Sequence, residues 1–204
     1  MVLIGAGAVQ AETVTVAALG DSLTAGYGLM PDDGLVAQLE DWLTAEGADV
    51  DIINAGVSGD TTAGGLSRVD WTLTPEVDAM IVTLGGNDYL RGIDPAVSRA
   101  NLDGILAAGQ AAGVDMLLVG LQVGGNYGAD YKQAFEAMYT DLAEQYDVPL
   151  YPDFLSALRA QGDAAGSVAR WMQADGIHPN REGVALIVAD LGPVVLDLVK
   201  QAAD

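Results

Sequence analysis

Three polar residues from opposite ends of the chain have the side chains that acyl transfer requires. Ser22 stands in the segment GDSLTAGYG at 20–28, and Asp175 and His178 stand in DGIHPNREG at 175–183. A serine hydroxyl becomes an effective nucleophile when a base removes its proton, and His178 is the only imidazole in the chain. A carboxylate usually holds such an imidazole in one tautomer, and Asp175 is close enough in the sequence to do so. These residues predict attack by Ser22 on an ester or thioester carbonyl.

The same chemistry needs hydrogen-bond donors for the oxyanion that forms on the attacked carbonyl. Three donors are available: the backbone N–H of Ser22, the backbone N–H of Gly59 in NAGVSGDT, and the side-chain amide of Asn87 in LGGNDYLRG. A glycine leaves its loop free of side-chain obstruction, and an amide donates without carrying charge. We therefore predict an oxyanion hole made by Ser22, Gly59 and Asn87.

Each of these features also has an ordinary structural interpretation. Ser22 could begin a simple turn, and a lone histidine such as His178 is commonly a satisfied core or surface residue. Asn87 and Asp88 could form an Asx-turn after a strand, and Gly59 could be a glycine at a helix start. The occurrence of all of them together, in this order along the chain, favours the catalytic interpretation.

Apolar runs and amphipathic segments predict the elements that must position these residues. Runs rich in Val, Ile and Leu predict β-strands within 14–19, 50–54, 78–88, 114–121 and 148–154. Apolar residues at helical spacing predict helices within 34–47, 99–113 and 131–147, and a last helix from about Asn180, its predicted N-cap, to Ala202.

This alternation of strands and helices predicts parallel strands joined by crossover helices. The strands show little polar alternation, which is typical of parallel strands buried on both faces. We therefore predict an α/β protein with three α/β/α layers. In such sheets ligands bind beyond the carboxyl ends of the strands, where we expect Ser22, Gly59, Asn87 and His178.

Composition excludes several other classes of protein and site. The 204 residues fit one domain, and the lack of cysteine excludes disulfides, thiolate catalysis and cysteine zinc sites. A single histidine also excludes a multi-histidine metal site. The formal net charge of −21 predicts repulsion from nucleic acid and anionic membrane surfaces.

The first residues have the composition of an export signal. The apolar stretch through Val9, with small residues leading to Ala11, resembles the end of a secretory signal peptide that is cut before Glu12. No positive segment precedes it, so a frayed cytoplasmic N-terminus or an extra strand is the alternative. We predict a signal-peptide remnant at 1–11, a single domain at 12–204, and a periplasmic or secreted protein. No other segment approaches the ~20 apolar residues of a membrane span.

Four sequence blocks together resemble the SGNH-hydrolase superfamily, also called the GDSL esterases and lipases. The blocks are GDSLTAGYG at 20–28, NAGVSGDT at 54–61, LGGNDYLRG at 84–92 and DGIHPNREG at 175–183, and every signature position is present. The resemblance extends from Val14 to the last helix. Within the superfamily the chain is most similar to the bacterial thioesterase I group of arylesterases, thioesterases and lysophospholipases, through GDTTAGGLSRV, ANLDGIL, GGNYGADY and WMQADGIHPN.

The resemblance implies a flavodoxin-like fold with five parallel strands and no metal or other cofactor. It implies Ser22 as the nucleophile, His178 as the base oriented by Asp175, and Gly59 and Asn87 as oxyanion donors. It further implies that the segment LQVGGNYGADY lines an acyl pocket and can move. From the residues alone, this segment is a glycine-rich loop at the correct edge of the sheet.

Other residues of these blocks receive structural or binding assignments. We interpret Asp21 and Asp60 as structural residues and Asp88 as a brace for Asn87 or its loop. We predict substrate contacts from residues close to the proposed site, with Tyr127 either a pocket wall or a surface residue; these are Asn126, Tyr127 and Ile177.

The expected substrate is a small ester, thioester or lysophospholipid handled by a monomer that binds no nucleic acid and does not insert stably into membranes. Because coenzyme A is anionic, the acidic composition ranks aryl esters and lysophospholipids above acyl-CoA. A carbohydrate or acetyl esterase of the same fold is the alternative enzyme. A non-catalytic acyl-binding module is the alternative class, which the intact set Ser22, Asp175 and His178 disfavours.

Overall fold

A computed structural model describes residues 13–162 and 169–203, so the predicted signal-peptide remnant at 1–11 lies outside the described residues. The strands are β1 (Val14–Gly20), β2 (Val50–Gly56), β3 (Ala79–Thr83), β4 (Asp115–Val119) and β5 (Leu150–Tyr151). The longer helices are α2 (Leu35–Ala45), α3 (Thr62–Thr72), α5 (Pro95–Ala112), α6 (Ala129–Tyr146) and α9 (Arg181–Ala202). Shorter turns of helix are α1 (Ser22–Ala25), η1 (Pro31–Asp33), α4 (Gly86–Leu90) and α7 (Ser156–Arg159).

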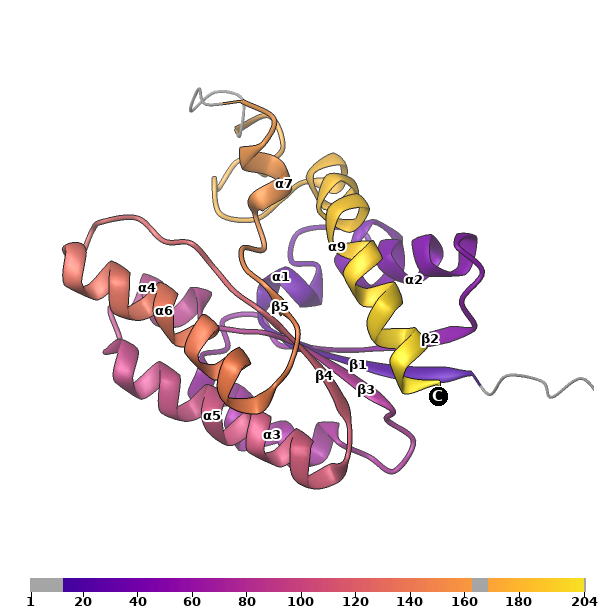
Figure 1. Ribbon diagram of the computed structural model, residues 1–204. Helices are drawn as coiled ribbons and strands as arrows, with labels where there is room; N and C mark the ends of the chain where they lie inside the picture. The colour runs from indigo at the N-terminus through magenta and orange to yellow at the C-terminus, as the bar shows by residue number, and fades with distance from the viewer. Residues whose placement is uncertain (1–12, 163–168, 204) are drawn as a thin grey trace, which may run out of the picture.

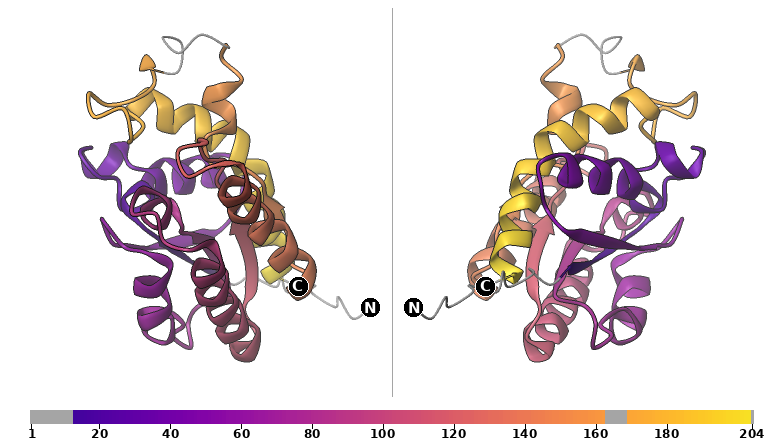
Figure 2. Two further views of the ribbon diagram at one scale, coloured as in Figure 1. Left: turned by 90° about the vertical axis from the view of Figure 1, so that its left-hand side faces the viewer. Right: turned by 90° about the vertical axis from the view of Figure 1, so that its right-hand side faces the viewer.

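The strands form one sheet in the order β2-β1-β3-β4-β5, and every pairing is parallel. Helices α3, α5 and α6 cover one face, and α2 and α9 cover the other (Figures 1 and 2). The predicted three-layer α/β/α fold with a five-stranded parallel sheet is confirmed. Helix α7 stands above the carboxyl end of β5 (Figure 1).

Burial explains why the central strands are uniformly apolar. All five residues of β3 are buried, as are six of the seven residues of β1, because helices pack on both faces. In edge strand β2 only Ile52 is buried, and the strand accordingly carries exposed polar residues such as Asp51 and Asn54. The pattern of apolar and polar residues therefore indicates whether a strand is central or at the edge, as well as that a strand forms.

Helix α3 was not among the predicted helices, because its sequence TAGGLSRVDWT contains two adjacent glycines that disfavour a helix. The helix forms because the Thr61 hydroxyl caps it by accepting from the Gly64 N–H. A Cβ at Gly65 would lie 2.2 Å from Leu84 Cδ1, so glycine permits the close approach of α3 to the segment after β3. Tertiary packing thus overrides the weak helix propensity.

The strand order reverses between β1 and β3. The chain passes from β1 to β2 on one side, and then crosses β1 to place β3 on its other side. A crevice forms at the carboxyl ends of two strands where such a reversal occurs. The short helices that follow β1 and β3, α1 and α4, carry Ser22 and Asn87 at this point. Among the described residues, no helix is long and apolar enough to cross a membrane.

Candidate active site

Ser22 is placed by a sharp transition from β1 to α1. Strand β1 ends at Gly20, and Ser22 is already the first residue of α1. The Asp21 carboxylate caps this helix by accepting the Leu23 N–H at 3.0 Å. A Cβ at Gly56 would lie 2.3 Å from the Ala25 nitrogen, so a side chain there would displace the turn.

The histidine is placed by a tight turn before α9. Asp175 Oδ1 accepts the backbone N–H groups of Ile177 and His178 at 2.9 and 3.1 Å. An isolated bridge between Met172 and Pro179 closes the segment. The predicted N-cap is confirmed, because Asn180 Oδ1 accepts the Gly183 N–H at 2.9 Å.

The predicted nucleophile, base and orienting carboxylate lie in one hydrogen-bonded line. Ser22 Oγ is 2.8 Å from His178 Nε2, and Asp175 Oδ2 is 2.6 Å from His178 Nδ1. The His178 hydrogen bond, with the Ile177 and His178 N–H groups, lowers the pKa of Asp175 from 3.8 to about 2. The carboxylate is therefore ionised at neutral pH and suited to hold a proton on Nδ1.

Two further residues, Tyr27 and Gln173, hold the imidazole and the segment that carries it. The Tyr27 ring lies 4.6 Å from the His178 ring, centroid to centroid, with a tilt of 38°. The Gln173 amide donates to the carbonyls of Tyr27 and Pro179 at 2.7 and 3.0 Å. Gln173 therefore ties the histidine segment to the loop after α1. This tether was not predicted from the sequence, although Gln173 lies within the block WMQADGIHPN.

The three predicted oxyanion donors line one cavity together with the nucleophile and base. Within the described part of the chain, the N–H groups of Ser22 and Gly59 donate to no protein acceptor. Gly59 has φ +85°, a conformation that favours glycine, and its carbonyl accepts from Arg91 Nη2 at 2.7 Å. Asn87 Nδ2 donates one hydrogen to Asp21 Oδ2 at 3.2 Å, so its second hydrogen is available for a ligand.

The Asp21 carboxylate is buried beneath this cavity and is only 2% exposed. Burial raises the pKa of Asp21 from 3.8 to about 6, against the smaller effects of its hydrogen bonds from Leu23 and Asn87. The cap fits the predicted structural role, and the contact to Asn87 adds a link to the proposed oxyanion hole.

Arg68 and Asp60 secure the strand ends below Ser22. Arg68 extends from α3 and donates to the carbonyls of Gly20 and Ala55, the first at 2.8 Å and the second at 2.7 Å. Its Nε pairs with Asp60 Oδ2 at 2.7 Å. The structural interpretation of Asp60 is therefore supported, and Arg68 is a positioning residue that the sequence analysis missed.

Asp88 braces the segment that carries Asn87 through contacts to two other helices. Its fully buried carboxylate accepts from the Thr62 N–H and hydroxyl at 2.8 and 2.5 Å, and from the Ser98 hydroxyl at 2.8 Å. These contacts join α4 to the first turn of α3 and to α5. Asp88 thus anchors the helix that carries Asn87.

The cavity beside Ser22 has a volume of about 400 Å³. Its wall is built mainly from apolar and aromatic side chains, which include Leu23, Tyr27, Tyr89, Leu90, Leu121, Val123, Leu155, Met172 and Ile177. Of the predicted substrate-binding residues, Ile177 lines this cavity, whereas Asn126 and Tyr127 lie outside the lining. The Tyr127 ring packs against Tyr131 and edge-on against Tyr89, which leaves it behind the wall and partly exposed.

Sequence reasoning did not anticipate most of these wall residues, because they come from five different segments. Tyr27 and Tyr89 stand inside the quoted blocks, next to Ser22 and Asn87, and could have been found by that signal. Met172 lies within the block WMQADGIHPN, whereas Leu155 carries no comparable signal. Among residues 13–162 and 169–203, no group of three or more His, Asp or Glu side chains is placed to hold a metal ion.

The arrangement is that of a serine hydrolase with an apolar cavity, and the comparison with known families agrees. The GDSL-like lipase/acylhydrolase family matches residues 18–186. The chain belongs to this family. The resemblance drawn from the four sequence blocks is thereby confirmed, and so is the assignment to the GDSL enzymes that hydrolyse carboxylic esters and thioesters.

Individual GDSL proteins align over nearly the whole chain. Esterase TesA of Pseudomonas aeruginosa is 39% identical over 191 residues, which cover 93% of this chain and 92% of the relative. Thioesterase 1/protease 1/lysophospholipase L1 of Escherichia coli is 37% identical over 188 residues, with 92% and 85% covered. The crystal structure of AlinE4, a SGNH-hydrolase family esterase, is 42% identical with a TM-score of 0.75, covering 92% of this chain and 97% of that one.

Proposed function

We propose that this GDSL enzyme hydrolyses esters of apolar acyl groups through an acyl-enzyme on Ser22. The observation that carries the proposal is the line of Ser22, His178 and Asp175, with contacts of 2.8 and 2.6 Å, at an apolar cavity. A non-catalytic acyl-binding module would not require this line. The geometry suits a nucleophile, a base and a residue that orients the base.

In the proposed reaction, His178 Nε2 removes the Ser22 proton as Oγ attacks the carbonyl carbon. The N–H groups of Ser22 and Gly59 and the Asn87 amide donate to the oxyanion that develops. His178 then transfers the proton to the departing alcohol or thiol, which leaves an acyl ester on Ser22. A water molecule, deprotonated by His178, releases the carboxylic acid and restores the Ser22 hydroxyl.

The cavity supports an apolar acyl group over a sugar. Its volume of about 400 Å³ lies within the usual range of small-molecule sites, and apolar side chains make up most of its lining. A sugar would require many hydrogen-bonding groups in the wall. Relatives named esterase, arylesterase and lysophospholipase agree with an acyl ester or lysophospholipid as substrate.

Thioesters are within the reach of the same chemistry, but the acidic composition disfavours coenzyme A as the leaving group. The formal charge of −21 predicts repulsion of this anionic carrier. We expect turnover of palmitoyl-CoA to rise with salt relative to an uncharged palmitoyl thioester. A ratio that is independent of salt would contradict this ranking.

The nucleophile is tested directly by fluorophosphonate labelling and mass spectrometry. We expect one label on Ser22, and loss of both label and p-nitrophenyl ester hydrolysis in Ser22→Ala. Full hydrolysis by Ser22→Ala would overturn the acyl-enzyme proposal. A Ser58→Ala variant is the matched control, because Ser58 also lines the cavity but the serine hydrogen-bonded to His178 is Ser22.

We further propose that the enzyme is exported and acts as a monomer. The small residues Val9 and Ala11 support cleavage before Glu12. N-terminal sequencing of protein from the periplasm or medium tests export, and light scattering tests the monomer. A mature chain that retains residues 1–11 in the cytoplasm would contradict export.

A further inference from the structure

The cavity wall formed by Gln122 and Val123 has no helix or strand to support it. These residues follow β4, which ends at Val119, and precede α6, which begins at Ala129. Glycines occupy three of the next five positions, Gly124, Gly125 and Gly128. A segment of this composition is intrinsically flexible. Its conformation must therefore be imposed by contacts from outside the loop.

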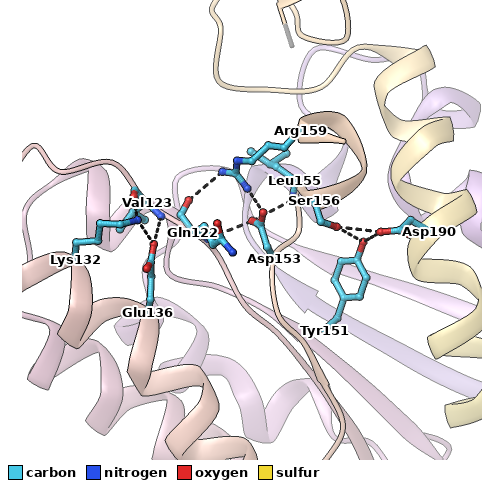
Figure 3. Close-up of polar contacts among 10 residues, drawn as sticks. All are labelled: Gln122, Val123, Lys132, Glu136, Tyr151, Asp153, Leu155, Ser156, Arg159 and Asp190. Carbon is cyan, nitrogen blue, oxygen red and sulfur yellow. Dashed lines mark hydrogen bonds and ion pairs between the residues drawn. The ribbon is translucent and has the colours of Figure 1, made fainter. Parts of the chain in front are cut away.

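Two charged pairs supply these contacts from opposite sides (Figure 3). On α6, Glu136 Oε1 accepts the Val123 N–H at 2.9 Å and Lys132 Nζ donates to the Val123 carbonyl at 2.6 Å. Lys132 and Glu136 also pair with each other. We call these two residues the α6 clamp.

The second pair holds the preceding residue in the same manner (Figure 3). Asp153 Oδ1 accepts the Gln122 N–H at 3.2 Å, and Arg159 Nη2 donates to the Gln122 carbonyl at 3.1 Å. Asp153 and Arg159 are themselves paired, and the Asp153 side chain is only 5% exposed. We call these two residues the α7 clamp.

The α7 clamp is in turn tied to the opposite layer of the fold. Ser156, at the start of α7, donates to Asp190 Oδ2 on α9 at 3.0 Å. The Tyr151 hydroxyl, from β5, also contacts both Ser156 and Asp190 (Figure 3). The N–H and C=O groups of two consecutive wall residues are thus bound to charged side chains that two different layers hold in place.

We propose that the α6 and α7 clamps fix the wall at Gln122 and Val123 and thereby set the acyl-chain lengths that the enzyme accepts. This inference rests on the proposed function, since it concerns the acyl cavity of that site. A longer chain contacts more of the wall than a short one, and each buried methylene contributes about fourfold to binding. Loosening the wall should therefore weaken the binding of long substrates more than that of short ones.

The primary test is Glu136→Ala, assayed on p-nitrophenyl decanoate and p-nitrophenyl butyrate. Loss of wall contact with about two methylenes should lower kcat/KM about 16-fold for the decanoate, chiefly through KM. The butyrate value should stay within about twofold of wild type. Glu136→Gln keeps an oxygen that can accept the Val123 N–H, so it should restore most of the decanoate activity. Glu144→Gln, at an exposed position of α6 away from the loop, is the matched control.

A second variant and a second measurement distinguish an effect of the clamp on the wall from an effect on overall stability. Lys132→Met should shift the decanoate-to-butyrate ratio in the same direction. Amide hydrogen exchange in the peptide that contains Gln122 and Val123 should accelerate about tenfold in Glu136→Ala, without a change in the sheet. An unchanged ratio in either clamp variant, or an equal loss on both esters, would overturn the inference. Inactivity of the wild type on both esters would instead refute the proposed function.

Discussion

The Asp21 carboxylate determines whether the Asn87 side chain presents its NH₂ group or its carbonyl oxygen to the substrate. It accepts the Leu23 N–H through Oδ1 and an Asn87 Nδ2 hydrogen through Oδ2. In Asp21→Asn, the new side chain has one oxygen and one NH₂ group. If its oxygen still accepts the Leu23 N–H, its NH₂ group must face the NH₂ group of Asn87. Two donors cannot satisfy each other, so we expect the Asn87 amide to rotate by half a turn. The oxyanion would then meet a carbonyl oxygen rather than an N–H.

The predicted loss of activity follows from the loss of that donor. Removing one oxyanion-hole donor typically lowers kcat by about 10²–10³-fold. KM should change little, because the interaction strengthens only as the oxyanion forms. Since Asp21→Asn acts through Asn87, the double variant with Asn87→Ala should be no slower than Asn87→Ala alone.

The same substitution should increase stability. The pKa of Asp21 is raised by burial from 3.8 to about 6, which corresponds to about 3 kcal/mol. A carboxyl group with a raised pKa stabilises the folded state below the unfolded pKa, and this contribution is lost as the pH rises through 6. A neutral asparagine avoids the burial of charge at pH 7. We expect Asp21→Asn to be more stable by up to about 3 kcal/mol at pH 7, and the difference to shrink toward pH 4.

The assay combines steady-state hydrolysis of p-nitrophenyl butyrate with urea unfolding at pH 7 and pH 4. Asp141→Asn, an exposed acid-to-amide change on α6, is the control for the altered net charge. Normal kcat in Asp21→Asn, or a double variant much slower than Asn87→Ala, would refute the link between Asp21 and Asn87. Lower stability at pH 7 would refute the argument from burial.

Three further predictions address the residues that hold the site. Asp175→Asn should lower kcat about 10²–10⁴-fold, because the imidazole loses the carboxylate that orients it. The pKa of Asp175 is lowered to about 2, so the carboxylate should stabilise the wild-type fold above pH 3.8. Thermal melts should show this stabilisation disappearing as the pH falls through 2. Arg68→Met should lower the free energy of unfolding by about 3 kcal/mol in urea titrations, and full rescue by Arg68→Lys would contradict the need for its multidentate contacts. Asp88→Ala should destabilise by about 3 kcal/mol, because it leaves buried donors of Thr62 and Ser98 unpaired, whereas wild-type stability would contradict that role.

Much of the sheet could be predicted because the apolar composition of a strand reflects how deeply it is buried. The runs at β1, β3 and β4 are apolar on both faces, as strands between two helical layers must be. Helix α3 was not predicted, because two glycines lower its helix propensity and the contacts that stabilise it come from residues distant in the sequence. Packing forces of this kind have no local signature.

The residues of the proposed site were also predictable, since the carboxyl ends of β1 and β3 carry Ser22 and Asn87. Their supports were not. Gln173, Arg68 and the two clamps act on backbone carbonyls and N–H groups that every residue possesses. A sequence does not reveal which backbone group a side chain will reach.

The sequence by itself determined the chemistry available to this protein: Ser22 with a single possible histidine partner, an aspartate three residues before that histidine, and an α/β framework that gathers strand ends at one edge. The tertiary structure decided whether they meet. Ser22 and His178 are 156 residues apart, and their contact of 2.8 Å depends on the capped turns at α1 and α9. It also decided the cavity, because the wall combines side chains from several loops, and the shape between them exists only once the layers have packed.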